Sequence, residues 1–512
     1  MPGKTGGQAA GPAKTQTCDE AGGKDSEKIG IFASCMKARQ VLGFLLGVFA
    51  LLGVLWLTVP ADGVPLGPLQ LRFASYQRTL ADAAQVKVDV DSVLRTVEAR
   101  FRMESDTLAY YRKFFYENPD RIYLPKDDYT YLDPLFRQLE QARRQGKTVR
   151  ITHYGDSQIE MDRISQDLRE ALQGRFGGSG TGLFPALGNV PSASISKVAN
   201  GGFEHFTMYG DSTTQRAGHN RYGPMAQVVK LTGGGTVSLR GTRNKNAREG
   251  VKTFESVCVL YGRPSKNFHL TASSDTLKPV PVVESGEQGT TLVTWHFGRQ
   301  VEKATLRFQG DAEIYAIGAD GDAGVAVDNI PLRGCSGTIF TRISQPLLEE
   351  SFALLDTRLI ILQFGGNYMP VATSTRVIER YQEQIAQQIQ YFHTVAPQAR
   401  ILFIGPSDMG KSVNGRIVTW PRLPELVDSL KATALRNDAA YWDLYRMMGG
   451  ENSMAQWVRH SPPYAGPDYI HFTPAGAQKV GDALSRSLLG YHDFYQLRKS
   501  LPKERVQQAM HP

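Results

Sequence analysis

The sequence predicts an α/β protein in which helices cover both faces of a parallel sheet, with a β-rich insert and one apolar segment in front. Three observations support this. Apolar runs alternate with amphipathic helical patterns in residues 145–190 and 328–495. Residues 191–327 instead alternate polar and apolar side chains, and residues 41–59 carry no charge. Strands that alternate with helices form parallel sheets, because each crossover helix returns the chain to the same edge.

Composition excludes several classes of protein. The chain has 512 residues, of which 41% are hydrophobic and 21% charged, as in ordinary globular proteins. Its net charge of +8 comes from 58 Lys+Arg and 50 Asp+Glu without a long basic block, so we expect no nucleic-acid partner. None of the four cysteines forms a CxxC motif, which argues against a zinc ribbon or thioredoxin site. Whether Cys258 and Cys335 pair stays open.

The apolar segment at residues 41–59 predicts a membrane anchor. Its 19 uncharged residues nearly span the ~30 Å hydrocarbon core of a bilayer. Lys37 and Arg39 precede it and Asp62 follows, so the positive-inside rule places the N-terminus in the cytoplasm. A cleaved signal peptide is the alternative, but 40 residues come before the segment. We therefore expect a single-pass protein of the inner (cytoplasmic) membrane with its catalytic part in the periplasm or otherwise outside the cytoplasm.

The regions beside the anchor and at the C-terminus lack the α/β pattern. Residues 1–40 are rich in Gly, Lys, Ser and Thr, which predicts a disordered cytoplasmic tail. Residues 60–144 carry two helical patterns, around residue 95 and from Asp133-Pro134 onward, and predict a helical stalk. Residues 496–512 are expected to form a C-terminal tail.

The α/β pattern itself begins with a β-prone run at residues 149–154, followed by Gly155-Asp156-Ser157 and a helical pattern that ends at Gly177. Further strands are expected at residues 358–364, 400–405 and 440–444. Helices should follow them, the last beginning at Thr473-Pro474.

The insert at residues 191–327 predicts a self-contained β-sandwich, because its short alternating runs contain no helix of useful length. Aromatic residues in it belong to the sandwich core in the first interpretation and stack on sugars in the second. They include Phe203, Phe206, Trp295 and Phe297.

Three polar motifs follow predicted strands and together indicate ester chemistry. Ser157 stands at a strand-to-helix turn, where its hydroxyl projects from the carboxyl edge of the sheet and its N–H can face an oxyanion. A serine hydroxyl needs a base, and His471 with Asp468 three residues before it supplies an imidazole oriented by a carboxylate. Asn367 follows the strand at residues 358–364 and can direct its amide into the same cleft.

This combination resembles the SGNH (GDSL-like) hydrolase family. The matching motifs are Gly155-Asp156-Ser157, Gly365-Gly366-Asn367 and Asp468-Tyr469-Ile470-His471, with Gln158 in place of the usual Leu. The resemblance implies a three-layer α/β/α fold and no cofactor or metal. It also implies a catalytic triad of Ser157, His471 and Asp468, and an oxyanion hole made by Ser157, a glycine and Asn367.

The glycine of the oxyanion hole is less well defined. Peptidoglycan O-acetylesterases of the family carry a carbohydrate-binding-like β-module between the serine and glycine motifs. Gly334 follows the insert here and is the favoured candidate, whereas Gly178 and Gly180 precede it.

Two further motifs are weaker. A second Gly-Asp-Ser at residues 210–212 lies inside the insert and has no amphipathic helix after it. Residues 405–412 match the P-loop pattern, but the residues that follow are a poor start for the helix that a P-loop requires.

We therefore expect a membrane-anchored serine esterase that removes acetyl groups from an envelope glycan, peptidoglycan or another polysaccharide. Two alternatives stay open. The chain could be an O-acetyltransferase that works with a multispanning membrane acyltransferase, or a non-catalytic glycan-binding protein.

Overall fold

The computed structural model describes residues 38–60, 64–67, 69–71, 76, 90–188, 190–210, 214–243, 247–275, 278, 280–283 and 289–510. It separates into two compact units, Met1–Arg100 and Phe101–Pro512. The predicted disordered tail, apart from its last three residues, and the second Gly-Asp-Ser serine, Ser212, lie outside the described residues.

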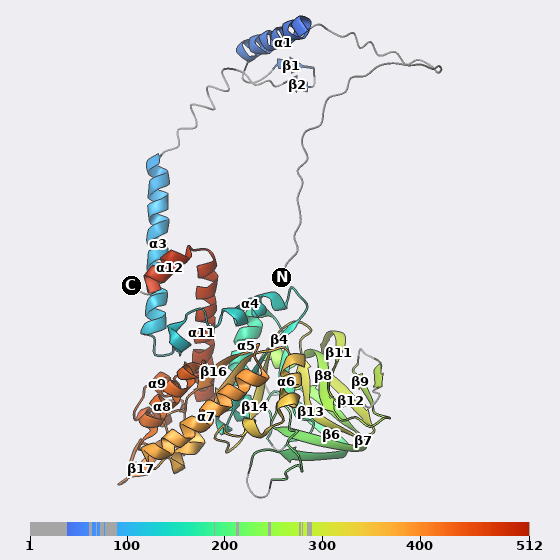
Figure 1. Cartoon of the computed structure of the whole chain (residues 1–512), viewed down its shortest axis with the longest axis vertical. Coiled ribbons are helices and arrows are strands. Elements are labelled where there is room, and N and C mark those ends of the chain that lie inside the picture. Colours follow the sequence, from blue (N-terminus) through green and yellow to red (C-terminus); the bar gives the residue numbers. More distant parts are fainter. Residues whose placement is uncertain are drawn as a thin grey trace, which may run out of the picture. The chain divides into compact units, whose positions relative to one another are not determined.

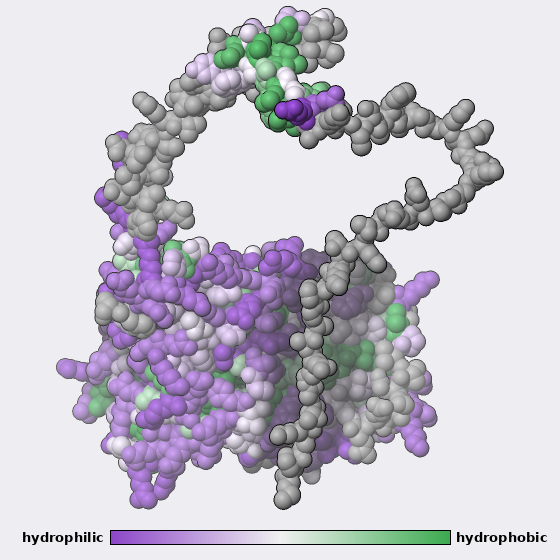
Figure 2. Space-filling model, turned by 45° about the horizontal axis from the view of Figure 1, so that its top comes forward, coloured by the Kyte–Doolittle hydropathy of each residue, from purple (hydrophilic) through white to green (hydrophobic). Residues whose placement is uncertain are grey.

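The first unit holds the apolar helix α1 (Ala38–Thr58) and a hairpin of β1 (Val64–Leu66) and β2 (Leu69–Leu71). Within the described residues, α1 is the one helix long and apolar enough to cross a membrane, a test that a signal sequence also passes. Most of its large side chains are exposed, and Figure 2 shows hydrophobic residues gathered on it while the visible face of the second unit is mainly hydrophilic. The long helix α3 (Val90–Tyr116) continues from this unit into the next.

A six-stranded sheet forms the centre of the second unit (Figure 1). Its order is β14 (Gly324–Pro331), β4 (Thr148–Gly155), β15 (Thr357–Gln363), β16 (Arg400–Ile404), β19 (Ala440–Trp442) and β3 (Ile122–Tyr123). The first five strands are parallel, and β3 pairs antiparallel with β19. The carboxyl ends of five strands therefore meet at one edge.

Helices cover both faces of this sheet, because successive strand residues point to opposite sides. Leu359 and Ile361 belong to one hydrophobic core and Ile360 and Leu362 to another. The first core contains α4 (Asp133–Ala142), α5 (Ser165–Phe176), α9 (Leu444–Met448), α10 (Ser453–Arg459), α11 (Pro474–Lys499) and α12 (Lys503–Met510), and the second contains α6 (Gln345–Leu354), α7 (Thr375–Val395) and α8 (Leu423–Arg436). The predicted three-layer parallel fold is thus confirmed.

Two predicted boundaries of this domain differ from the structure. β3 completes the sheet and α4 packs on it, so residues 122–142 belong to the α/β domain rather than to a stalk. α12 is a helix and not a tail, because Val506 and Met510 are 3% and 2% exposed in the core. The sequence pattern predicted neither β3 nor α12, because a two-residue strand has no periodicity and α12 has few apolar residues.

The β-rich insert is one nine-stranded antiparallel sheet. β7 pairs with β13 through its first residues and with β12 through its last, so the sheet bends near Gly233 and encloses a core of its own. Trp295 and Phe297 are buried in this core, as the first interpretation of the aromatic residues predicts. The strands are β5 (Gly180–Phe184), β6 (Ile195–Thr207), β7 (Gln227–Gly241), β8 (Phe254–Gly262), β9 (His269–Ser273), β10 (Val280–Val283), β11 (Thr290–Val301), β12 (Lys303–Gln309) and β13 (Ala312–Asp320).

The insert is less separate than the sequence predicts. β5, which precedes residue 191, pairs with β13, and β14, which begins before residue 327, belongs to the parallel sheet. Side chains of β8 and β13 lie in the same core as α6 and α7. Buried Arg150 of β4 also binds Asp320 of β13 and Asp328 of β14 at 2.6 and 2.5 Å. The insert and the α/β domain therefore share a core and an ion-pair network.

Candidate active site

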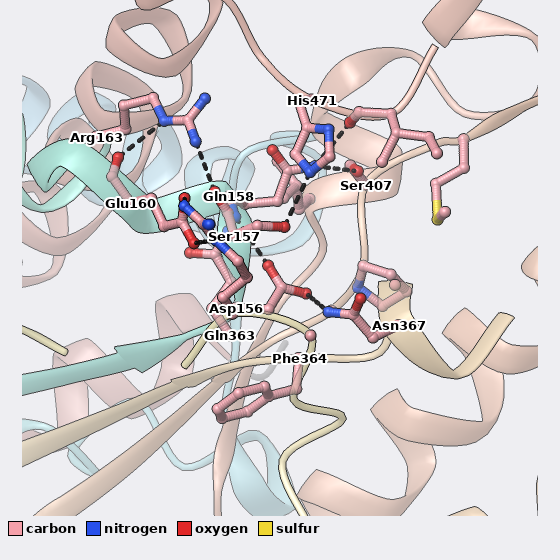
Figure 3. Close-up of a pocket in the computed structure, with 18 of the residues that line it drawn as sticks. Asp156, Ser157, Gln158, Glu160, Arg163, Gln363, Phe364, Asn367, Ser407 and His471 are labelled. Carbon is pink, nitrogen blue, oxygen red and sulfur yellow. Dashed lines mark hydrogen bonds and ion pairs between the residues drawn. The ribbon is translucent and has the colours of Figure 1, made fainter. Parts of the chain in front are cut away.

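A cleft of about 540 Å³ opens at the carboxyl edge of the parallel sheet (Figure 3). Residues just beyond all five parallel strands line it, together with residues of the loop before α11. They include Gly334 after β14, Ser157 after β4, Asn367 after β15, Pro406 after β16, Leu444 after β19, and His471. The topology thus brings together motifs more than 300 residues apart in the chain.

Ser157, His471 and Asp468 form a continuous hydrogen-bonded relay. Ser157 Oγ lies 2.9 Å from His471 Nε2, and His471 Nδ1 lies 2.7 Å from Asp468 Oδ2. The carboxylate accepts a hydrogen bond from the Nδ1–H of a neutral imidazole, which leaves the Nε2 lone pair toward the serine hydroxyl. This is the geometry in which the imidazole can remove the serine proton.

Asp468 is held as a carboxylate by its own turn. Its Oδ1 accepts the backbone N–H groups of Ile470 and His471 at 3.0 and 3.1 Å. Partial burial alone would raise the pKa of Asp468, but the hydrogen bond with the His471 ring and these two N–H groups outweigh it and lower the pKa. Asp468 therefore stays ionised and keeps the imidazole oriented.

The backbone at Ser157 differs from the predicted helix start. Ser157 opens a 3₁₀ segment, Ser157–Asp162, and α5 begins only at Ser165. Met161 and Ile164 have φ of 59° and 65°, so an α-helix cannot run through this segment. Asp156 caps the 3₁₀ turn by accepting the N–H of Gln158 at 2.9 Å. Ser157 thus lies on a tight, capped turn rather than at the end of a long helix.

Two side chains from this turn hold the loop that carries His471, and neither was among the predicted site residues. Gln158 Nε2 donates to the carbonyl of Ile470 at 2.7 Å, and its Oε1 accepts the N–H of Phe472 at 3.4 Å. Arg163 donates to the carbonyls of Ser157 and Phe472 at 2.6 and 3.1 Å. These bonds bracket His471 on both sides. One indication of the role of Gln158 was present in the sequence, which is that it replaces the usual Leu. A buried amide needs hydrogen-bond partners.

Asn367 lies on the opposite wall of the cleft. Its Nδ2 group donates to Asp156 Oδ2 at 2.9 Å and to the carbonyl of Cys335 at 3.2 Å. An amide nitrogen has two hydrogens, so both are engaged here. Burial raises the pKa of Asp156 to about 6, although the hydrogen bonds from the Gln158 N–H and the Asn367 amide oppose this. Asn367 can serve an oxyanion only by exchanging one of these acceptors.

Gly334 lines the same cleft as Ser157 and Asn367 and has a φ of 75°. In the described part of the chain, the N–H groups of Ser157 and Gly334 donate no hydrogen bond to the protein. Arg333 beside Gly334 pairs with buried Glu160 of the serine turn, Nη2 to Oε2 at 2.7 Å. Gly178 and Gly180 do not line the cleft, and a Cβ on either would come within 2.5 Å of backbone of β14 or β13.

The P-loop pattern at residues 405–412 has a different structure. Ser407 and Met409 line the rim of the cleft, and β17 (Gly410–Val413) pairs with β18 (Arg416–Thr419) in a hairpin. A phosphate-binding loop must open into a helix, so this loop is not one. Cys258 and Cys335, the two cysteines described, are both buried free thiols, and burial raises the pKa of Cys335 to about 11.

Part of the chain is similar to a known protein family. Residues 307–479 match the family model of the GDSL-like lipase/acylhydrolase family, a range that contains Asn367, Asp468 and His471 but begins after Ser157. No curated protein sequence matches the chain significantly.

Among solved structures, a peptidoglycan O-acetylesterase is 19% identical, with a TM-score of 0.57 over 72% of this chain and 96% of its own. A family two carbohydrate esterase from Cellvibrio japonicus is 10% identical, covering 59% of this chain and 99% of its own, with a TM-score of 0.24. An acetyl xylan esterase is 14% identical over 31% of this chain and 79% of its own, with a TM-score of 0.25. The first match establishes a common fold, and the other two are too distant to add to the argument. Residues 307–479 are thus similar to the GDSL-like lipase/acylhydrolase family, and the chain has the fold of an SGNH hydrolase, similar to that of a peptidoglycan O-acetylesterase.

Proposed function

We propose that the chain is a membrane-anchored serine esterase that removes acetyl groups from a glycan of the cell envelope, with its catalytic domain outside the cytoplasm. The observation that carries the proposal is the relay of Ser157, His471 and Asp468, which opens into a cleft at the carboxyl edge of the sheet. One structurally similar protein is a peptidoglycan O-acetylesterase, which supports an acetylated glycan as substrate.

The geometry supports a two-step reaction. His471 Nε2 takes the proton of Ser157 as Oγ attacks the acetyl carbonyl carbon, and the carbonyl oxygen becomes an oxyanion. The N–H groups of Ser157 and Gly334 and the amide of Asn367 are the donors proposed for that oxygen. His471 then returns the proton to the departing sugar oxygen, leaving acetyl-Ser157. Water, deprotonated by His471, attacks the acyl-enzyme and releases acetate.

The membrane part of the proposal rests on α1, which is apolar enough to span a bilayer, and on the basic residues before it. Hydrolysis is preferred over transfer because it needs no partner. A membrane acyltransferase would be required only if a sugar hydroxyl, and not water, accepts the acetyl group.

The test uses the full-length chain in detergent micelles, given O-acetylated peptidoglycan and acetylated xylan with and without unacetylated acceptor oligosaccharides. Acetate release and acetyl transfer are measured together. Release that disappears in Ser157→Ala supports the esterase. Transfer without release makes the protein a transferase, and a folded wild-type chain that binds glycan but cleaves no acetyl ester overturns the proposal in favour of a glycan-binding role.

A further inference from the structure

A second cavity lies beside the catalytic cleft, between the insert and the α/β domain. It encloses about 250 Å³. The residues that line it come from β5, β6 and β7 of the insert, from the loops beside these strands, and from the end of β14. The ones that matter here are Phe184, Lys197, Tyr209, Gln227, Asn329 and Pro331. Its size suits a single sugar ring with a substituent.

Lys197 makes this cavity positively charged. Its Nζ donates to the carbonyl of Pro185 and lies 5.8 Å from the centre of the Phe184 ring. Among the described residues no carboxylate pairs with it, and no Asp or Glu lines the cavity. Burial lowers the pKa of Lys197 to about 8, so at neutral pH the group is mostly a cation without a counter-charge. An ammonium group in such a place favours an anionic ligand.

The neutral polar groups around Lys197 do not compensate this charge. Gln227 is engaged with the ring of His205 at 2.7 Å. The Tyr209 hydroxyl donates to the carbonyl of Pro331 at 3.3 Å. Phe184 and Ile195 supply an apolar floor. The cavity thus combines one cation with apolar surface, which fits a sugar ring that bears a carboxylate.

Neighbouring residues at the end of β14 line the cavity and the catalytic cleft. Asn329 and Pro331 of β14 line the cavity, and Arg333 and Gly334, directly after it, line the cleft. Asn329 Nδ2 also donates to the carbonyl of Ile159 in the serine turn at 2.8 Å. A ligand in the cavity would therefore contact Asn329, which is hydrogen-bonded to the turn that carries Ser157.

We propose that this cavity is a glycan subsite that binds a carboxylate-bearing sugar close to the one that presents its acetyl ester to Ser157. The proposal rests on the proposed function and deepens it by naming the substrate class as an acidic glycan. The carboxylate belongs either to the lactyl ether of a muramic acid that carries no stem peptide or to a uronic acid, and the probes below separate these sources.

The experiment measures direct binding to the full-length Ser157→Ala chain in detergent, so that it does not depend on turnover. The probes are the disaccharide of N-acetylglucosamine and N-acetylmuramic acid, chitobiose, which lacks the lactyl carboxylate, and digalacturonate. We expect the muramyl disaccharide or digalacturonate to bind more tightly than chitobiose. Lys197→Met should weaken that binding at least tenfold and leave chitobiose unchanged, whereas Lys197→Arg should retain most of it.

Lys303→Met is the matched control, because Lys303 is an exposed lysine of the same insert, and it should change nothing. Removal of a partly buried charge should not unfold the protein, which an unchanged melting temperature would verify. Equal loss for acidic and neutral sugars, or no loss in Lys197→Met, would overturn the subsite. Hydrolysis of a simple acetyl ester by the wild-type chain reports separately on the proposed function.

Discussion

The two walls of the catalytic cleft are built in different ways. On the histidine wall, the side chains of His471 and Asp468 are 40% and 47% exposed. On the asparagine wall, Asp156 and Cys335 are 5% and 6% exposed. The first wall is a surface loop fixed by a few hydrogen bonds from the serine turn, whereas on the second the exposed residue Asn367 donates to two buried groups, Asp156 Oδ2 and the carbonyl of Cys335. Substitutions on the first should therefore change reactivity alone, whereas those on the second should change stability as well.

The largest effect is expected from the relay itself. Ser157→Ala and His471→Ala should each lower kcat for a simple acetyl ester by several orders of magnitude, because the members of such a relay act as a unit. Their melting temperatures should stay near that of the wild-type chain, since both residues lie in the open cleft. Near-normal turnover in Ser157→Ala would show that another nucleophile is used.

A smaller effect is expected on the opposite wall. Asn367→Ala should lower kcat by roughly 10²–10³ with little change in KM, because its amide would act on charge that appears only in the transition state. It should also destabilise the protein by about 1–3 kcal/mol, since buried Asp156 loses a donor. A variant that loses stability but keeps full kcat would restrict Asn367 to a structural role. Both quantities are read from kinetics and denaturant unfolding of the same samples.

Substitution of Gln158 should lower reactivity without lowering stability, because Gln158 positions the surface loop of His471. Gln158→Leu introduces the residue usual in the family motif and removes the bonds to Ile470 and Phe472. We expect kcat to fall by about tenfold as the His471 loop loosens, with little change in KM. Gln158→Glu keeps the acceptor but not the donor and should be intermediate. The result that would contradict this view is a Gln158→Leu chain with unchanged kcat and an unchanged pH–rate profile.

The smallest effect is a pH-dependent change in stability at Asp156. Its pKa of about 6 lies above the usual 3.8, so the folded state holds the proton more tightly than the unfolded state. The ionised carboxylate therefore costs stability, and this cost appears as pH rises from about 4 to above 6. The free energy of unfolding of Asp156→Asn relative to that of the wild-type chain should therefore increase by about 2 kcal/mol when the pH is raised from 4 to 7.5. Unfolding curves at both pH values test this, and a constant difference would contradict it.

Much of the fold was predictable because buried parallel strands and amphipathic helices have strong periods. The strands at residues 357–363 and 400–404, and the helix that Thr473 caps, match their predicted places closely. Ser157 was predicted from its position after a strand, and His471 and Asp468 from their three-residue spacing; the structure brings the three within hydrogen-bonding distance.

The rest depended on contacts that no local pattern encodes. The late start of α5 follows from residues with positive φ such as Ile164, whose side chain gives no indication of that backbone conformation. The edge of the insert was misplaced because β5 and β14 look alike as short strands and differ only in their partners. The bonds from Gln158 and Arg163 to the histidine loop join residues about 310 positions apart.

The place of β4 in the sheet has a consequence for how the chain matures. This strand leads into the turn of Ser157 and is synthesised early, yet it pairs on one side with β14 and on the other with β15. The side-chain bonds that join it to them, from Arg150 to Asp328 and from His153 to Gln363, span 178 and 210 residues. Contacts of such long range form slowly, because a large loop must close before they can form. During synthesis β4 therefore has no sheet partners until the whole insert and β15 have been made. Its apolar residues need protection from aggregation during that interval.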